Sequence, residues 1–370
     1  MTFEFADGLR AIAAIGVVLF HTYTYTGLSE QNQLLPVVFK ILNLGDFAVA
    51  IFIVLSGFVL MLPVATSPDL YLRGGIGEYL KRRARRILPP YYAAVGGYLV
   101  LILLVPGLNE ETGTAWDSKV PVTIGGVVSH ALLIHNLSPE WGYQIDGPTW
   151  SVATEWQIYF AMPLLLLPLW RRFGGRAAVL TAILLGWAVH FLFPQVDLAH
   201  FWFVGLFALG MAASWHVRRG SVRVRGGFVV AALLVTLVPA AAAFGLMHRL
   251  AWLSETAVGA AVALLLVWMA QRSASDEKTW AHSLLEWNPL VKVGNWSYSL
   301  YLVHSPIIGI ANLILLPWPM PLVARFALLA CVAMPIAAAI SYGFHRLIER
   351  RFMTSHQRSI RSTISSQGLI

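Results

Sequence analysis

The sequence has 370 residues, of which 58% are hydrophobic and only 12% are charged, and its formal net charge is +8. A soluble domain carries about 25% charged residues, so this composition predicts a polytopic membrane protein. The positive charge is typical of membrane orientation, and we expect membrane lipid but no nucleic acid as a partner. The single cysteine, Cys331, excludes a disulfide framework and a cysteine metal site.

Apolar windows of about 20 residues predict an all-α fold with about ten transmembrane helices. These windows fall at about 9–26, 46–65, 87–106, 150–170, 177–194, 199–216, 227–247, 251–271, 292–315 and 323–344. An eleventh apolar segment, 121–137, is short and has acidic stretches on both sides, which favours a re-entrant or surface helix. We expect one integral-membrane domain over residues 1–352, followed by a polar, disordered cytoplasmic tail at 353–370.

Loop charge predicts the orientation of these spans. If both termini are cytoplasmic, 22 of the 26 Lys and Arg residues fall in cytoplasmic segments and 4 fall outside. This asymmetry follows the positive-inside rule, so we expect a multi-pass protein of the cell membrane with both termini in the cytoplasm.

The first span carries two ionisable residues, Arg10 and His21. Eleven residues turn an α-helix by about three full turns, which places both side chains on one face, about 16 Å apart along the axis. Because an ionisable group in lipid costs roughly 2.5–3.5 kcal/mol, such groups usually face a protein interior or a wet cavity. The alternative is an anchoring arginine and a histidine bonded to a neighbouring helix.

Two further ionisable groups are expected at a similar depth. His304 lies about 18 Å into the ninth span from the cytoplasm, as does His21 in the first, and Glu155 lies about 8 Å below the outer surface. Matched depth on three helices suggests a shared polar cavity in the outer half of the membrane, although a structural hydrogen-bond network is an alternative. The other residues expected to line this cavity are Ser56, Trp150, Tyr159, Tyr298 and Tyr301.

A basic cluster, Lys81-Arg-Arg-Ala-Arg-Arg86, stands at the predicted cytoplasmic start of the third span. Such a cluster is most often a topology anchor that touches anionic lipid. Arginine forks also suit phosphate and pyrophosphate, and Arg83 and Arg86 share a helix face because they are three residues apart.

Six sequence elements occur in order along the chain: the Arg10 and His21 pair, Phe52-Ile-Val-Leu-Ser56-Gly57-Phe58, Arg83-Ala-Arg-Arg86-Ile-Leu-Pro89-Pro-Tyr91, Trp150 to Tyr159, Ser297 to His304, and His345-Arg346-Leu-Ile-Glu349-Arg350-Arg351-Phe352. With these elements the chain from about 5 to 352 resembles the acyltransferase family 3 integral-membrane proteins. It departs from the family pattern at Ile53, Ile158 and Arg351, none of which is a proposed reactive group. The resemblance implies ten spans with cytoplasmic termini, which agrees with the charge count.

The resemblance also implies transfer of an acyl group, often acetyl from acetyl-CoA, to a hydroxyl of a sugar, cell-surface glycan, lipid or secondary metabolite. Such transfer needs a base that is effective near neutral pH, which His21 would supply, with Glu155 orienting its ring. We expect Arg83 and Arg86 to hold the polyphosphate of acyl-CoA, and Arg10 to bind a CoA phosphate or stabilise a thioester oxyanion. Direct transfer and an acyl-histidine intermediate both fit these residues.

Other interpretations stay open. Intramembrane His, Glu and Arg also build substrate paths in transporters, and His304 competes with His21 as the base. A third interpretation is a non-catalytic partner of other membrane proteins.

For the remaining residues the sequence favours structural roles or secondary contacts. Ser56-Gly57 favours close helix packing, and Glu349 is expected to pair with Arg350. His135 and Asp146 are possible acceptor contacts, and since no histidine shows metal-ligand spacing, no metal is expected.

Overall fold

The computed structural model describes residues 3–30, 42, 45–67, 69–220, 222–242 and 249–353, and within these ranges all regular secondary structure is helical. The single long helices are α1 (Glu4–Tyr25), α3 (Gly45–Met61), α4 (Gly75–Leu104), α8 (Gly175–Leu192), α9 (Phe203–Arg219), α10 (Gly226–Ala242), α12 (Ala251–Ala274) and α15 (Ser297–Leu315). Two further long stretches each consist of three consecutive elements: α6 (Trp150–Ala161), η6 (Met162–Leu166) and α7 (Leu167–Phe173), and α16 (Leu322–Leu328), η8 (Leu329–Ala333) and α17 (Met334–Leu347). The short ones are η3 (Ala115–Lys119), α5 (Ile124–Ala131), η4 (His135–Leu137), η5 (Gly147–Thr149), η7 (Pro194–Ala199), α13 (Trp280–Leu285), α14 (Asn288–Asn295) and η9 (Glu349–Phe352).

The predicted all-α membrane fold is confirmed, because each of the ten predicted spans coincides with a helix. Seven helical segments are long and apolar enough to cross a membrane. The other three predicted spans fall on α3, α9 and α10, each of which is 17 residues long within the described residues. The last residues of the span predicted at 227–247, and the tail beyond Met353, lie outside the described residues.

Two predicted spans differ from the helices found. The third begins at Gly75 instead of residue 87, so the basic cluster lies within α4 and not before it. The ninth is interrupted at Trp296, which separates α14 from α15. The short segment predicted at 121–137 consists of α5 and η4, and α5 is only 8 residues long.

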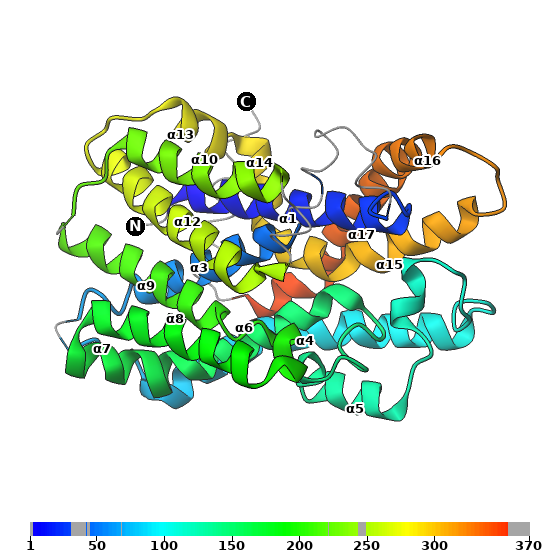
Figure 1. Cartoon of the computed structure of the whole chain (residues 1–370), viewed down its shortest axis with the longest axis horizontal. Helices are drawn as coiled ribbons and strands as arrows, with labels where there is room; N and C mark the ends of the chain where they lie inside the picture. The colour runs from blue at the N-terminus through cyan, green and yellow to red at the C-terminus, as the bar shows by residue number, and fades with distance from the viewer. Residues whose placement is uncertain are drawn as a thin grey trace.

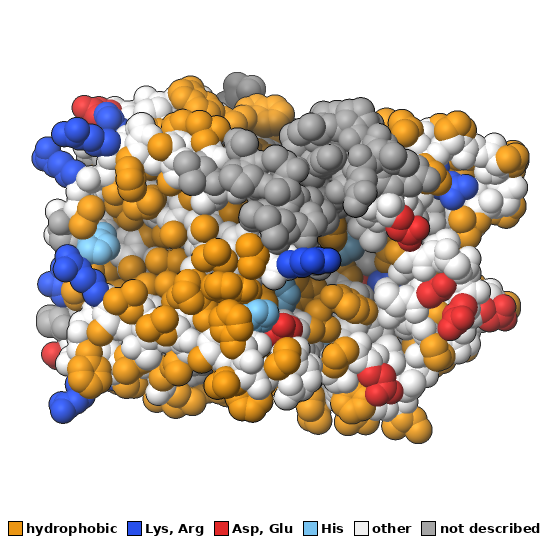
Figure 2. Space-filling model, viewed as in Figure 1, with side chains coloured by type: hydrophobic (Ala, Val, Ile, Leu, Met, Phe, Trp, Pro, Cys, Tyr) orange, Lys and Arg blue, Asp and Glu red, His pale blue; other side chains and the backbone are white. Residues whose placement is uncertain are grey.

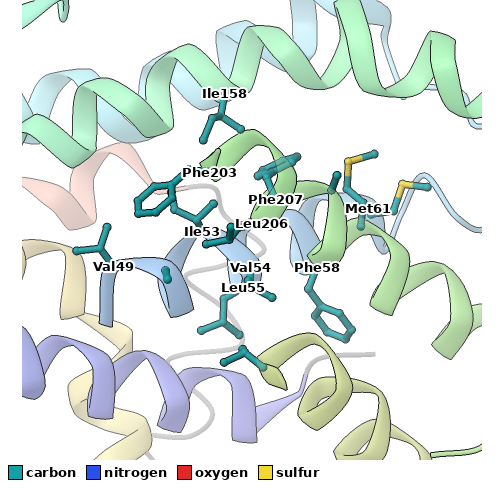
Figure 3. Close-up of a cluster of buried hydrophobic side chains, with 14 of the residues drawn as sticks. Val49, Ile53, Val54, Leu55, Phe58, Met61, Ile158, Phe203, Leu206 and Phe207 are labelled. Atoms are coloured by element: carbon teal, nitrogen blue, oxygen red, sulfur yellow. The ribbon is translucent and has the colours of Figure 1, made fainter. Parts of the chain in front are cut away.

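Helix α3 occupies the centre of the apolar core and packs against α1, α9 and α12. Its buried side chains meet those of α9, as Figure 3 shows for Val54, Phe203 and Phe207. The backbones approach closely at Gly57, where an added Cβ would collide with the carbonyl oxygen of Phe207. The predicted close packing at Ser56-Gly57 is therefore confirmed for Gly57.

The long helices run along the longest axis of the molecule, and the connecting segments gather at its two ends (Figure 1). The 105–149 segment and the link from α15 to α16 lie toward the right end, whereas the links from α9 to α10 and from α12 to α13 lie toward the left. Figure 2 shows Lys and Arg side chains concentrated at the left end, most visible Asp and Glu toward the right, and hydrophobic side chains between. The two segments named first, which are predicted to lie outside, therefore share one end of the molecule, and the two links named second, which are predicted to be cytoplasmic, share the other.

Candidate active site

The first feature of the site is a histidine pair between α1 and α15. Nδ1 of His21 lies 3.1 Å from Nε2 of His304, although the two residues are 283 positions apart in the sequence. His304 is fully buried, and His21 is half-buried. Two of the three ionisable groups predicted at one depth are thus in direct contact.

The surrounding carbonyl groups determine which ring nitrogens carry protons. Nδ1 of His304 lies 2.9 Å from the carbonyl oxygen of Leu300, which can only accept a hydrogen bond, so Nδ1 donates and Nε2 of a neutral His304 accepts. Nδ1 of His21 then faces two acceptors, because the carbonyl oxygen of Val17 also lies 2.9 Å away. It follows that His21 is protonated at Nδ1 and carries a lone pair on Nε2. This Nε2 has no hydrogen-bond partner within the described part of the chain.

Glu155 lies in a second polar cluster, and the expected contact with His21 is not formed. Its Oε1 accepts hydrogen bonds from the hydroxyl of Ser56 at 2.9 Å and from that of Tyr159 at 2.5 Å. Matched depth alone is compatible with different directions around the helix axis, which explains this difference. The predicted cavity residues Ser56 and Tyr159 are brought together by Glu155.

Helix α4 divides the basic cluster between two faces. Lys81 and Arg85 are exposed, whereas Arg83 and Arg86 turn inward on one face, as their spacing predicts. Arg83 lies within electrostatic range of Tyr159 and Glu155, so this face reaches the bundle interior and is not confined to its rim. Nε of Arg83 and Nη1 of Arg86 are buried and have no hydrogen-bond partner among the described residues.

Glu349 holds Arg86 from the other side. Nη2 of Arg86 lies 3.8 Å from the carboxylate of Glu349, which is 1% exposed. The same carboxylate accepts from the hydroxyl of Ser299 and from Nδ1 of His345, each at 2.7 Å. The expected pairing of Glu349 with Arg350 is therefore wrong: a helix-end position in sequence does not reveal that η9 turns its carboxylate toward α4.

Arg10 lies apart from both clusters. Its guanidinium pairs with Asp7 at 2.5 Å, one turn earlier on α1, and both side chains are about a quarter exposed. Within the described chain, Asp7 is the only hydrogen-bond or ion-pair partner of Arg10.

The three remaining predicted cavity residues connect elements. Tyr298 donates to the carbonyl oxygen of Ile87 on α4, and Tyr301 donates to that of Pro148 at the start of α6. Trp150 packs on the ring of His200, with centroids 4.4 Å apart. Trp150 is therefore placed against a neighbouring ring at the start of α6.

A buried network that the sequence did not predict lies beside the histidine pair. Lys119 is 1% exposed, pairs with Asp146 at 3.4 Å and donates to the hydroxyl of Ser305 at 3.1 Å. Ser305 follows His304 and also bonds to the hydroxyl of Tyr25 at 3.0 Å. Burial raises the pKa of Asp146 to about 6, against the opposing attraction of Lys119. The sequence feature that could have indicated this network is Lys119 itself, because it is the single basic residue in an acidic segment predicted to lie outside.

The unpartnered nitrogens of Arg83 and Arg86 fit an anion. Buried N–H groups usually have acceptors, and a guanidinium matches the oxygens of a phosphate. Within the described residues, the histidine pair and the α4 face thus offer an imidazole nitrogen without a hydrogen-bond partner and a buried set of guanidinium nitrogens that suits an anion.

Comparison with known proteins gives a consistent result. The profile described as "Acyltransferase domain" matches residues 3–342. The chain is 27% identical over 329 residues to the acyltransferase MdmB of Streptomyces mycarofaciens, covering 81% of this chain and 78% of that protein. It is 25% identical over 340 residues to the putative peptidoglycan O-acetyltransferase YrhL of Bacillus subtilis, covering 83% of this chain and 48% of that protein, about half its length. No solved structure matches.

Proposed function

Since the chain belongs to acyltransferase family 3, we propose that it moves an acyl group, acetyl above all, from cytoplasmic acyl-CoA to a hydroxyl group. The acceptor is a sugar, cell-surface glycan, lipid or secondary metabolite that reaches the site from the outer side. The name of the relative YrhL, a putative peptidoglycan O-acetyltransferase, supports a glycan acceptor. Both termini face the cytoplasm in this proposal, in agreement with the charge asymmetry of the two molecular ends.

The observation that carries the proposal is that Nε2 of His21 has no hydrogen-bond partner among the residues that the structure describes. A general base must present a lone pair to the attacking hydroxyl, and the hydrogen bonds of Nδ1 leave one on Nε2. His304 uses both ring nitrogens and is fully buried, so it orients His21 as the carboxylate does in a catalytic triad. His21 is therefore preferred over His304 as the base.

The proposed reaction is a direct transfer. Nε2 of His21 takes the proton of the acceptor hydroxyl while its oxygen attacks the thioester carbonyl carbon. The carbon–sulfur bond then breaks, and the leaving CoA thiolate takes the proton back from the imidazolium. The products are an ester and free CoA, and His21 returns to its starting state.

Two groups of residues have supporting roles. Arg83 and Arg86 hold the donor phosphates, and Glu349 fixes the guanidinium of Arg86. Glu155, with Ser56 and Tyr159, forms the polar surface between the α4 face and α6. Arg10 pairs with Asp7, and its proposed contact is a CoA phosphate.

The test uses purified protein in liposomes with acetyl-labelled acetyl-CoA outside and candidate hydroxyl acceptors supplied on either side. The expected result is protein-dependent label in an alkali-labile ester, together with release of free CoA. Uptake of unmodified label without ester formation would support a transporter instead. If neither ester nor uptake appears with any acceptor class, the proposed transfer to these acceptors is contradicted. Binding of acetyl-CoA to the same protein then tests whether the chain has a donor site at all.

A further inference from the structure

The phosphate-binding face of α4 extends beyond the two arginines. Tyr79 lies four residues before Arg83 and seven before Arg86. Seven residues turn an α-helix through about two full turns, so the three side chains share a face and span about 10 Å of helix. Tyr79 lies nearer the start of α4, the end proposed to face the cytoplasm.

Tyr79 is unusual among the tyrosines of α4. The hydroxyls of Tyr91, Tyr92 and Tyr98 donate to carbonyl oxygens of other segments. The side chain of Tyr79 is only 3% exposed, yet its hydroxyl has no hydrogen-bond partner in the part of the chain that the structure describes. A buried hydroxyl without a partner destabilises a protein, so its presence calls for an explanation.

The polar groups around Tyr79 favour an anionic ligand. Arg82, Arg83 and Glu155 lie within electrostatic range of its hydroxyl. The carboxylate of Glu155 accepts its hydrogen bonds from Ser56 and Tyr159, so it does not pair with Tyr79. Three unpartnered donors therefore lie along one face: the hydroxyl of Tyr79, Nε of Arg83 and Nη1 of Arg86. A ligand that satisfies all three must be rich in acceptor oxygens over this length, as a nucleotide polyphosphate is.

We propose that the hydroxyl of Tyr79 donates a hydrogen bond to a phosphate of the acyl donor, as the third member of the site formed with Arg83 and Arg86. This inference rests on the proposed function, because it requires a phosphate-bearing donor. Tyr79 acts in donor binding and takes no part in the acyl transfer step.

The test is Tyr79→Phe, which removes one oxygen and keeps the ring. A lost hydrogen bond to a charged group should weaken CoA binding by about tenfold or more. The same variant should leave the melting temperature of the ligand-free protein unchanged or raised, because the unpartnered hydroxyl is gone. Tyr92→Phe is the matched control on the same helix: it loses the bond to Ala131 and should bind CoA as the wild type does.

A phosphate-free donor, acetyl-pantetheine, separates donor binding from a structural effect. The Tyr79→Phe protein should use acetyl-pantetheine as well as the wild type does, while its KM for acetyl-CoA rises. Unchanged CoA affinity in Tyr79→Phe, with CoA binding lost in Arg83→Ala/Arg86→Ala, would overturn the inference alone. If CoA affinity were unchanged in the folded Arg83→Ala/Arg86→Ala protein as well, the proposed donor site on α4 would be contradicted as a whole. Equal loss with both donors would assign Tyr79 a structural role.

Discussion

At the residue scale, the geometry of the histidine pair distinguishes two residues that were both candidates for the base from the sequence alone. His21 keeps a free nitrogen, whereas His304 joins the carbonyl of Leu300 to the ring of His21. To position His21, residue 304 needs only a hydrogen-bond acceptor at the place now occupied by Nε2 of His304. A side chain with an acceptor there should therefore preserve the tautomer of His21, and an apolar side chain should not.

This difference predicts that His304→Gln retains far more activity than His304→Leu. The amide oxygen of glutamine can accept from Nδ1 of His21, so turnover should fall only a few-fold, whereas His304→Leu should lose about 10²-fold or more. Turnover of both variants at matched CoA occupancy is the measurement, with His190→Gln as a control at a histidine that contacts neither member of the His21–His304 pair. Equal loss in both His304 variants would show that His304 does more than position His21.

The sequence predicted which ionisable residues lie inside the helical bundle but not all of their partners. His21 and His304 meet as their depths suggest, because depth along two adjacent helices brings side chains to one level. Glu155 has a similar expected depth yet bonds to Ser56, because rotation about α6 cannot be read from depth. The burial of Lys119 was not predicted, because the residue lies in the short η3 outside the apolar spans, where periodicity gives no sign of burial.

At the scale of elements, the 105–149 segment contains a buried ion pair, and the lysine of this pair also contacts the helical bundle. Lys119 of η3 contacts Asp146 and Ser305, and it lies over the rings of Tyr25 and Trp116. Leaving one buried charge without its partner costs about 3–5 kcal/mol, while replacing both charges with apolar groups is often neutral.

We therefore predict that Lys119→Met sharply lowers the melting temperature of the purified protein. The double variant Lys119→Met/Asp146→Leu should recover most of this loss, because no unpaired charge remains. Thermal unfolding in detergent measures both. A double variant that is no more stable than Lys119→Met would show that the lysine contributes through contacts other than the ion pair.

The short elements of the same segment carry a second titratable pair. His130 and His135 stack with ring centroids 3.8 Å apart. Burial lowers the pKa of His130 to about 4 and that of His135 to about 3, from an ordinary value of 6.5. The unfolded chain thus binds these protons more tightly, so the stability from the neutral rings is complete above pH 6.5 and is lost as the pH falls toward 4.

This pH dependence predicts a shallower decline for His135→Phe. The substitution keeps a stacking ring and removes one titrating group, so its melting temperature should fall less than that of the wild type between pH 7 and 4.5. Melting curves across this range are the measurement, and Tyr92→Phe, which removes no group that titrates between pH 4.5 and 7, should decline in parallel with the wild type. Parallel declines for His135→Phe and the wild type would contradict the assignment.

Helix positions were predicted better than helix bounds. Hydropathy windows stop where charges accumulate, so the start of α4 was missed by twelve residues. Pro89 and Pro90 lie inside α4, although proline favours the first turn of a helix. Tertiary contacts of the inward face, including the ion pair of Arg86 with Glu349, explain why the helix continues through them.

At the scale of the whole molecule, the two charged ends define an orientation that can be tested. In a Cys331→Ala background, single cysteines at Thr112 and Tyr143 should react with impermeant thiol reagents on intact cells, and one at Val222 should not. Tyr143 and Val222 are exposed, so access is limited by the membrane and not by packing. Labelling at Val222 alone would reverse the topology and place the α4 phosphate face on the wrong side for cytoplasmic CoA.

The account depends most on His21 as the base that accepts the hydroxyl proton. The decisive measurement is acyl transfer by purified, monodisperse His21→Ala protein, with CoA affinity measured on the same sample. We predict that CoA affinity is preserved while transfer falls by about 10²–10⁴-fold, the usual loss for a general base. Near-normal transfer by this protein would contradict the assignment, and a subsequent loss of transfer in both His304→Leu and His304→Gln would move the catalytic role to α15.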